Sequence, residues 1–127
     1  MKLALDTNAY RLVMEGNDDA VNLVRAAEIV LMPVPVIAEL RYGFLRGTKG
    51  RRNEAFLVRF LDQPRVEVLL CDEVTTHHYA LLKDQLKRQG TPIPINDVWI
   101  AALVVQHAAV LLTRDCDFDH LPQLPRA

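Results

Sequence analysis

Four short apolar runs, separated by longer stretches with a helical period, constrain the fold of this chain more than any other feature. The runs span residues 2–5, 29–34, 66–70 and 109–113. They have the length of strands, and the second is rich in β-branched residues. Strands that are apolar on both faces and alternate with helices are typical of a parallel sheet covered by helices on both sides. The sequence therefore predicts an α/β fold.

Helical patterns fill most of the intervals between the runs, at residues 18–28, 35–45, 73–89 and 98–105, and again around Phe56, Leu57 and Phe60, which are expected to face inward. Asn17, Asp72 and Asn96 precede three of these patterns, where such side chains can accept hydrogen bonds from the first turn. Gly90 suits the left-handed position past a helix end. Two connections are expected to be irregular, the basic segment Arg46–Asn53 and the Pro-rich segment Thr91–Ile95.

Length and composition favour one compact domain over residues 1–127. Half of the 127 residues are hydrophobic, which is enough to bury roughly two thirds of the unfolded surface. No apolar run approaches the roughly 20 residues of a membrane span, and no secretory leader is visible. We therefore expect a cytoplasmic protein without membrane association. Cys71 and Cys116 lie too far apart in sequence to indicate a zinc site or a disulfide framework.

Acidic residues stand beside several of these elements. Asp6 and Asp115 follow apolar runs, Asp97 opens an apolar helix, and Glu39 lies at the border of a helical stripe. In parallel sheets ligands bind beyond the carboxyl ends of the strands. Two carboxylates about 4 Å apart repel each other by on the order of 4 kcal/mol at an effective dielectric of about 20. Bound Mg²⁺ or Mn²⁺ would remove that repulsion, so a metal site that acts on a phosphate ester is predicted.

Each acidic residue also has a simpler structural explanation. Asp6, Thr7 and Asn8 can form a turn that caps a helix, and Asp97 can serve only the helix dipole. Glu39 can be a solvated helix residue. These alternatives stay open for each residue taken alone.

The segment after the last apolar run holds three acidic residues. Asp115 and Asp117 straddle Cys116, so at most one is expected to point into the site, and we favour Asp115 because it follows the strand most closely. Thr113 and Asn8 can orient carboxylates by hydrogen bonding, although turn chemistry explains each as well.

Basic residues gather in one part of a chain whose net charge is only −1. A solvated surface and a path for a polyphosphate backbone explain this cluster equally well. The cluster consists of Arg41, Arg46, Lys49, Arg51 and Arg52.

The order of these motifs resembles the PIN-domain ribonucleases, and more narrowly the toxins of VapBC-type toxin–antitoxin pairs. The resemblance rests on DTN after the first run, a helical Glu, ND before an apolar helix and TRDCDF after the last run. It covers essentially the whole chain. It implies a three-layer α/β/α sandwich with a central, mostly parallel sheet of four to five strands.

The resemblance further implies an endoribonuclease that requires Mg²⁺ or Mn²⁺, with Asp6, Glu39, Asp97 and Asp115 in the family's acidic positions. Asp117 matches a further acidic position, and Thr7, Asn8, Asn96 and Thr113 are candidates for supporting contacts. A homodimer and a cognate antitoxin that blocks the acidic pocket are also implied. We expect a metal-activated water, rather than a protein nucleophile, to cut the RNA.

Two other classes of protein share some of these features. A PIN-like protein could hold RNA or an antitoxin without cutting. A phospho-receiver domain also has an acidic Mg²⁺ pocket, with Asp72 as its acceptor, but it needs a Lys after the last strand where this chain has Arg114. The identity of the RNA, the bases cut and the antitoxin are not encoded in a recognisable motif.

Overall fold

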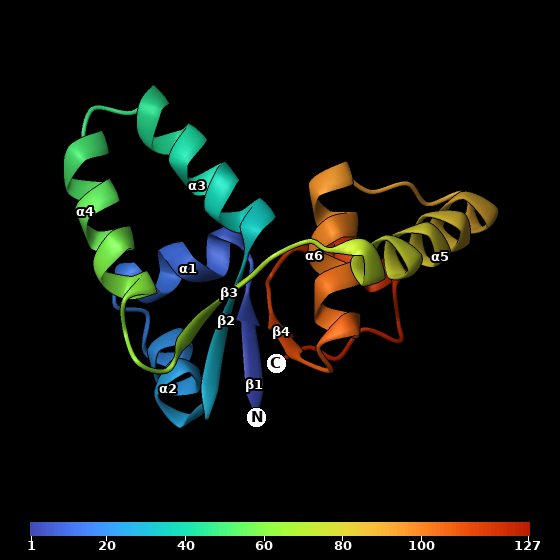
Figure 1. Ribbon diagram of the computed structural model, residues 1–127, viewed down its shortest axis with the longest axis horizontal. Helices are drawn as coiled ribbons and strands as arrows, with labels where there is room; N and C mark the ends of the chain where they lie inside the picture. The colour runs from blue at the N-terminus through green and yellow to red at the C-terminus, as the bar shows by residue number, and fades with distance from the viewer.

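The computed structural model describes residues 1–127 as a parallel sheet with helices on either side (Figure 1). Its four strands are β1 (Lys2–Leu5), β2 (Ile29–Pro33), β3 (Val66–Leu69) and β4 (Val110–Leu112). Their order across the sheet is β3-β2-β1-β4, and every pair is parallel. Leu3 of β1 is in register with Val30 on one side and Val110 on the other. The predicted α/β class and the parallel sheet are confirmed.

Six α-helices and one 3₁₀ helix complete the chain. They are α1 (Thr7–Met14), α2 (Asp18–Ala26), α3 (Val34–Arg46), α4 (Gly50–Leu61), α5 (Glu73–Gln89), α6 (Ile95–Gln106) and η1 (Cys116–His120). Figure 1 shows α1 to α4 on one side of the sheet and α5 with α6 on the other. No helix combines the length and the apolar character that crossing a membrane requires.

The core forms one cluster of 29 buried hydrophobic residues. Helix α6 contributes the continuous buried run from Ile100 to Val104, which explains why its sequence is apolar on nearly every side. It lies between the sheet and α5, so both of its faces meet protein. Burying a Leu or Ile side chain is worth about 1.5–3 kcal/mol. Burial of these side chains therefore stabilises the packing of α6 between α5 and the sheet.

Three predicted helix ends are confirmed. The Asn17 side chain accepts a hydrogen bond from the Ala20 amide at 3.1 Å, and Asp72 accepts one from the Thr75 amide at 3.0 Å. The Thr75 hydroxyl accepts one from the Asp72 amide in return, which completes a capping box. Gly90 ends α5 with a φ of 70°, in the left-handed region that glycine adopts without strain.

The helix at residues 7–14 was not predicted. Its eight residues give too short a pattern to separate it from a turn, and Asp6 caps it. Phe56 was expected to face inward, but its side chain is 37% exposed, with the guanidinium groups of Arg52 and Arg59 over its ring. These two cation–π contacts stabilise the Phe56 ring at the surface of α4.

Two predicted boundaries were wrong. The segment Arg46–Asn53 is not a loop throughout, because α3 ends at Arg46 and α4 begins at Gly50. A Cβ at Gly50 would lie 2.7 Å from the Phe44 carbonyl oxygen, so a glycine permits this tight turn between helices. Asn96 does not cap α6, which begins at Ile95 with Pro94 as its N-cap, two residues earlier than predicted. The fixed φ of proline suits the start of a helix.

Candidate active site

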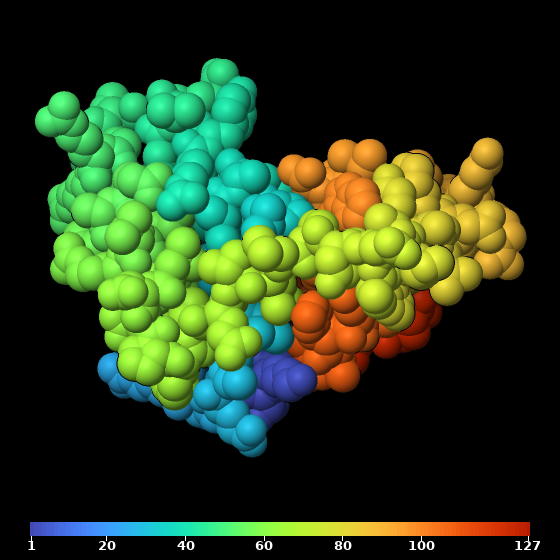
Figure 2. Space-filling model, viewed as in Figure 1, coloured from blue at the N-terminus to red at the C-terminus, as the bar shows by residue number.

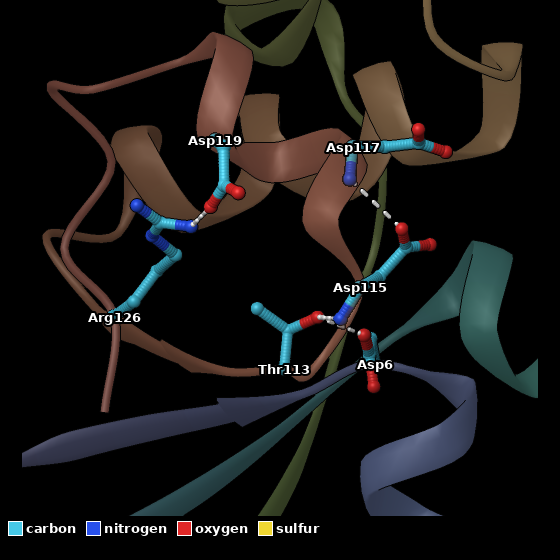
Figure 3. Close-up of polar contacts among 6 residues, drawn as sticks. All are labelled: Asp6, Thr113, Asp115, Asp117, Asp119 and Arg126. Carbon is cyan, nitrogen blue, oxygen red and sulfur yellow. Dashed lines mark hydrogen bonds and ion pairs between the residues drawn. The ribbon is translucent and has the colours of Figure 1, made fainter.

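Asp6 stands where β1 ends beside β4, and hydrogen bonds hold both of its carboxylate oxygens. Its Oδ1 accepts the Ala9 amide at 2.8 Å and so caps α1. Its Oδ2 accepts the hydroxyl of Thr113, the residue that follows β4 (Figure 3). The side chain is only 5% exposed. A buried carboxylate fixed from two directions is oriented before any ligand arrives.

The Thr113 hydroxyl joins Asp6 to the next acidic segment. While donating to Asp6, this oxygen accepts the Asp115 amide at 3.0 Å. Asp115 in turn accepts the Asp117 amide at 2.9 Å and caps η1. One hydroxyl therefore sets the relative position of two carboxylates from opposite ends of the chain. The predicted role of Thr113 as an orienting partner is consistent with this geometry.

Glu39 reaches the same region from α3. The Thr7 hydroxyl donates to Glu39 Oε2 at 2.9 Å, which ties the first turn of α1 to the middle of α3. Glu39 is half-buried rather than solvated. Asn8, which follows Thr7 in α1, takes no part in this contact. It is exposed, and its side-chain oxygen accepts a 3.5 Å hydrogen bond from Arg11.

Asp97 lies in the first turn of α6 and shows that these carboxylates converge. Its pKa is raised from the ordinary 3.8 to about 7, first by burial and then by neighbouring negative charges. In decreasing order these charges belong to Asp115, Glu39, Asp117 and Asp6. All the acidic residues predicted for the site therefore act on one carboxyl group. Asn96, beside it, is exposed on the same turn.

Asp6 responds to the same neighbours. Burial raises its pKa most strongly, the hydrogen bonds from Thr113 and Ala9 oppose this, and the charges of Asp115 and Glu39 raise it further. The hydrogen bonds favour the ionised form, whereas burial and like charges favour the protonated form. The site thus contains more negative charge than its surroundings compensate.

Of the three acidic residues that follow β4, Asp115 and Asp117 differ from Asp119. Asp115 and Asp117 extend to the same side of the segment, whereas Asp119 turns to Arg126 and forms an ion pair with it (Figure 3). Ligand atoms of Asp115, Cys116 and Asp117 lie within 4.8 Å of one another. Both Asp115 and Asp117 raise the pKa of Asp97. Asp115 remains the stronger candidate, because it also acts on Asp6.

Comparison with known proteins identifies this arrangement. A family model for the PIN domain matches residues 3–124, from β1 to the segment after η1. The chain belongs to the PIN-domain family.

Relatives of this PIN domain support the assignment across nearly its whole length. Ribonuclease VapC4 of Mycobacterium tuberculosis is 34% identical over 72% of this chain and 70% of its own. Ribonuclease VapC1 of Haemophilus influenzae is 31% identical over 87% of this chain and 84% of its own. The structure of VapBC2 from Rickettsia felis, bound to a DNA fragment from its promoter, superposes with a TM-score of 0.88. That match has 27% identity and covers 100% of this chain and 98% of the other.

The donor set of this PIN domain fits a hard divalent cation. The acidic cluster consists of Asp6, Glu39, Asp97, Asp115 and Asp117, and carboxylate oxygens are the ligands that Mg²⁺ and Mn²⁺ prefer. The raised pKa values of Asp6 and Asp97 show that the negative charge is not compensated by the protein. No Lys or Arg forms an ion pair with any member of the cluster. Cys116, which the sequence did not indicate, is the one sulfur at its edge.

The predicted basic cluster lies on α3, on α4 and in the turn between them, in the arm on one side of the hollow between α3 and α6 (Figure 2). Its members are not equivalent. Arg41 forms two hydrogen bonds with Glu54, at 2.9 and 3.1 Å, so its charge is largely neutralised. Arg46, Arg51 and Lys49 are exposed and in no ion pair, and so is Arg52.

Proposed function

We propose that this PIN domain, residues 1–127, is a Mg²⁺- or Mn²⁺-dependent endoribonuclease and the toxin of a type II toxin–antitoxin pair. The observation that supports it best is the raised pKa of Asp97, about 7, which is caused first by burial and then by the converging negative charges of Asp115, Glu39, Asp117 and Asp6. Separate structural roles for these acidic residues would not bring their charges together at a cost in stability. Relatives named as VapC ribonucleases support the RNA-cleaving chemistry.

Each residue has a role in the proposed mechanism. Asp6 and Asp97 hold the principal cation, while Glu39 and Asp115 complete the pocket through waters or a second ion, with Asp117 as an alternative to Asp115. When bound, the cation supplies Lewis acidity to the scissile phosphate and to the attacking water. Thr7 and Thr113 keep Glu39 and Asp6 in place through their hydroxyl groups.

The products identify the attacking group. The chain needs no nucleophile of its own, so water attacks in line and leaves a 5′-phosphate and a 3′-hydroxyl. An attack by the 2′-hydroxyl of the RNA would instead give a 2′,3′-cyclic phosphate. End-group analysis of cleaved RNA separates the two. A cyclic phosphate, or full cleavage in excess EDTA, would contradict this mechanism.

Asp6→Asn tests the site itself. We expect the variant to fold, because an Asn side chain still caps α1, and to lose cleavage. Asp119→Asn is the matched control. It removes a carboxylate from the same segment, but one that forms an ion pair with Arg126. Equal activity of Asp6→Asn and the unchanged protein would remove Asp6 from the site.

Partners follow from the same relationship. We propose a homodimer and a cognate antitoxin that blocks the acidic cluster, supported by the similarity to a VapBC complex. Because the proposed substrate is RNA, we propose that the protein acts in the cytoplasm. Arg46, Lys49, Arg51 and Arg52 are proposed to guide RNA phosphates, whereas the ion pair with Glu54 gives Arg41 a structural role.

Two rival functions make different predictions. A non-cleaving PIN-like protein would bind RNA or an antitoxin but leave RNA intact when Mg²⁺ or Mn²⁺ is added. A phospho-receiver needs an acceptor Asp after a middle strand. Asp72 instead follows the edge strand β3, and its carboxylate accepts hydrogen bonds from Thr75 and Gln106. The structure therefore does not support the receiver.

A further inference from the structure

A groove lies between α5, residues 91–94 and the start of α6. These helices are on the other side of the sheet from α3 and α4, which hold the basic cluster. The volume of the groove is about 300 Å³. Leu86 and Val98, which are 2% and 1% exposed, form its apolar floor together with Ile93. The ammonium-bearing side chains of Lys83 and Lys87 line it as well. We call this site the α5 groove. It combines an apolar floor with two cations.

Neither of these lysines has a carboxylate partner. The acidic residue between them in α5, Asp84, pairs with Arg88 at 3.0 Å instead. Two like charges four residues apart on a helix destabilise it slightly. The negative end of the helix dipole favours Lys87, which lies in the last turn, but Lys83 lies farther from that end. The Lys83 ammonium group lies over the Tyr79 ring, 5.9 Å from its centroid, and keeps its positive charge in this contact. Neither lysine is neutralised, so both can attract an anion.

The α5 groove adjoins the acidic cluster through α6. Val98 in the groove directly follows Asp97 of the cluster, and the segment at residues 91–94 leads into the same helical turn. Figure 1 shows this arm on the far side of α6 from α3 and α4. An RNA strand that crosses the acidic cluster from the basic cluster would therefore meet the α5 groove next.

The size and chemistry of the groove favour one kind of occupant. A volume of about 300 Å³ is at the lower end of the range of small-molecule sites, roughly 300–1,000 Å³. It suits a single base or ribose better than a protein helix. The apolar floor can contact the base or sugar, while Lys83 and Lys87 can contact the phosphates on either side of it.

We propose that the α5 groove binds one nucleotide of the RNA substrate, beyond the scissile phosphate on the α5 side. This inference rests on the proposed nuclease function, because the RNA must first occupy the acidic cluster. It extends the RNA footprint from the α3–α4 arm to the α5 arm. The groove would then contribute to affinity and to the choice of cleavage position.

The experiment measures RNA binding as a function of salt. Binding of a labelled single-stranded RNA is titrated in the Asp6→Asn background, which is not expected to cut it, with and without Lys83→Ala and Lys87→Ala. Each phosphate contact contributes a slope of about −0.7 for single strands, so losing two should reduce the slope by about 1.4. The advantage of the parent should therefore shrink about sevenfold between 50 and 200 mM salt.

Arg88→Ala is the matched control. It removes one positive charge from the same turn of α5 as Lys87, but from a residue that is already paired with Asp84. We expect Lys87→Ala to reduce the salt slope by about 0.7 and Arg88→Ala to leave it unchanged. Equal effects of the two would show that only total charge matters, and would overturn the α5 groove.

Three further outcomes are decisive. A double lysine variant with Asp6 in place that binds and cuts RNA like the unchanged protein overturns the groove and leaves the nuclease function standing. A variant that loses self-association in light scattering but keeps the full salt slope makes the groove an interface between copies, which also overturns the proposal. An unchanged protein, with Asp6 in place, that neither binds nor cuts RNA overturns both proposals.

Discussion

Replacing Asp97 with Asn should make the metal-free protein more stable although it destroys the site. The Asp97 carboxyl is half-buried at the start of α6 and surrounded by four other carboxylates, and these features raise its pKa to about 7. Above that pH the folded chain must keep Asp97 ionised in an unfavourable place. An Asn side chain of the same shape removes that charge.

The magnitude follows from the difference between the folded and unfolded pKa. Between about pH 4 and 7 the folded state holds a proton on Asp97 that the unfolded state has lost, so the free energy of unfolding falls as pH rises. The difference between a pKa of 3.8 and one of about 7 corresponds to a loss of stability of at most about 4 kcal/mol. Solvent screening reduces this to about 2 kcal/mol.

The substitution also has a cost. Asp97 is the one acidic residue in the first turn of α6, and losing its favourable interaction with the helix dipole costs about 0.3–1 kcal/mol. The net expectation is a gain of about 1–2 kcal/mol at pH 8 and little change at pH 4, where Asp97 of the unchanged protein is already protonated and has no charge to lose.

Urea unfolding in EDTA at pH 4, 6 and 8 measures this directly, with Asp119→Asn as the control. The control removes an exposed carboxylate that pairs with Arg126, so it should change stability by less than about 1 kcal/mol. Added Mg²⁺ should stabilise the unchanged protein at pH 8 and stabilise Asp97→Asn much less. A variant no more stable than the parent at pH 8 in EDTA would refute the idea that burial and neighbouring charges destabilise ionised Asp97.

Other substitutions separate the site from the scaffold. Thr113→Val removes the hydroxyl that orients Asp6, so cleavage should fall by about 10–100-fold, and Thr113→Ser should restore it in the same assay. Asp72→Ala removes the cap of α5 and a partner of buried Thr75, which should cost about 1–2 kcal/mol in urea unfolding without changing cleavage per folded molecule. Leu103→Ala in the fully buried part of α6 should cost about 2–5 kcal/mol by the same measurement.

The fold was largely predictable because the strands and the long helices carry strong periodic signals. Val66–Leu69 and Glu73–Gln89 appear within a residue of their predicted limits. The misses have local causes. Helix α1 is too short to show a period, and α4 begins earlier than expected because the close approach to Phe44 at Gly50 is a tertiary contact invisible in the sequence.

The members of the candidate site were proposed from the sequence, but their connections could not be. Asp6 and Asp115 were selected because they follow strands, Asp97 because it opens a helix, and Glu39 because it borders a helical stripe. The hydrogen bond from Thr7 to Glu39 could not be predicted, since it depends on how α1 packs against α3. The paired state of Arg41 likewise depends on α4, which brings Glu54 to it.

The order of the strands has a consequence for how the protein is made. Because β4 lies beside β1, the last strand to be synthesised completes the neighbourhood of the first, and Thr113 must emerge before Asp6 is held. A growing chain that still lacks its final segment has no assembled centre. The proposed nuclease centre can therefore assemble only after synthesis has passed β4 and Thr113.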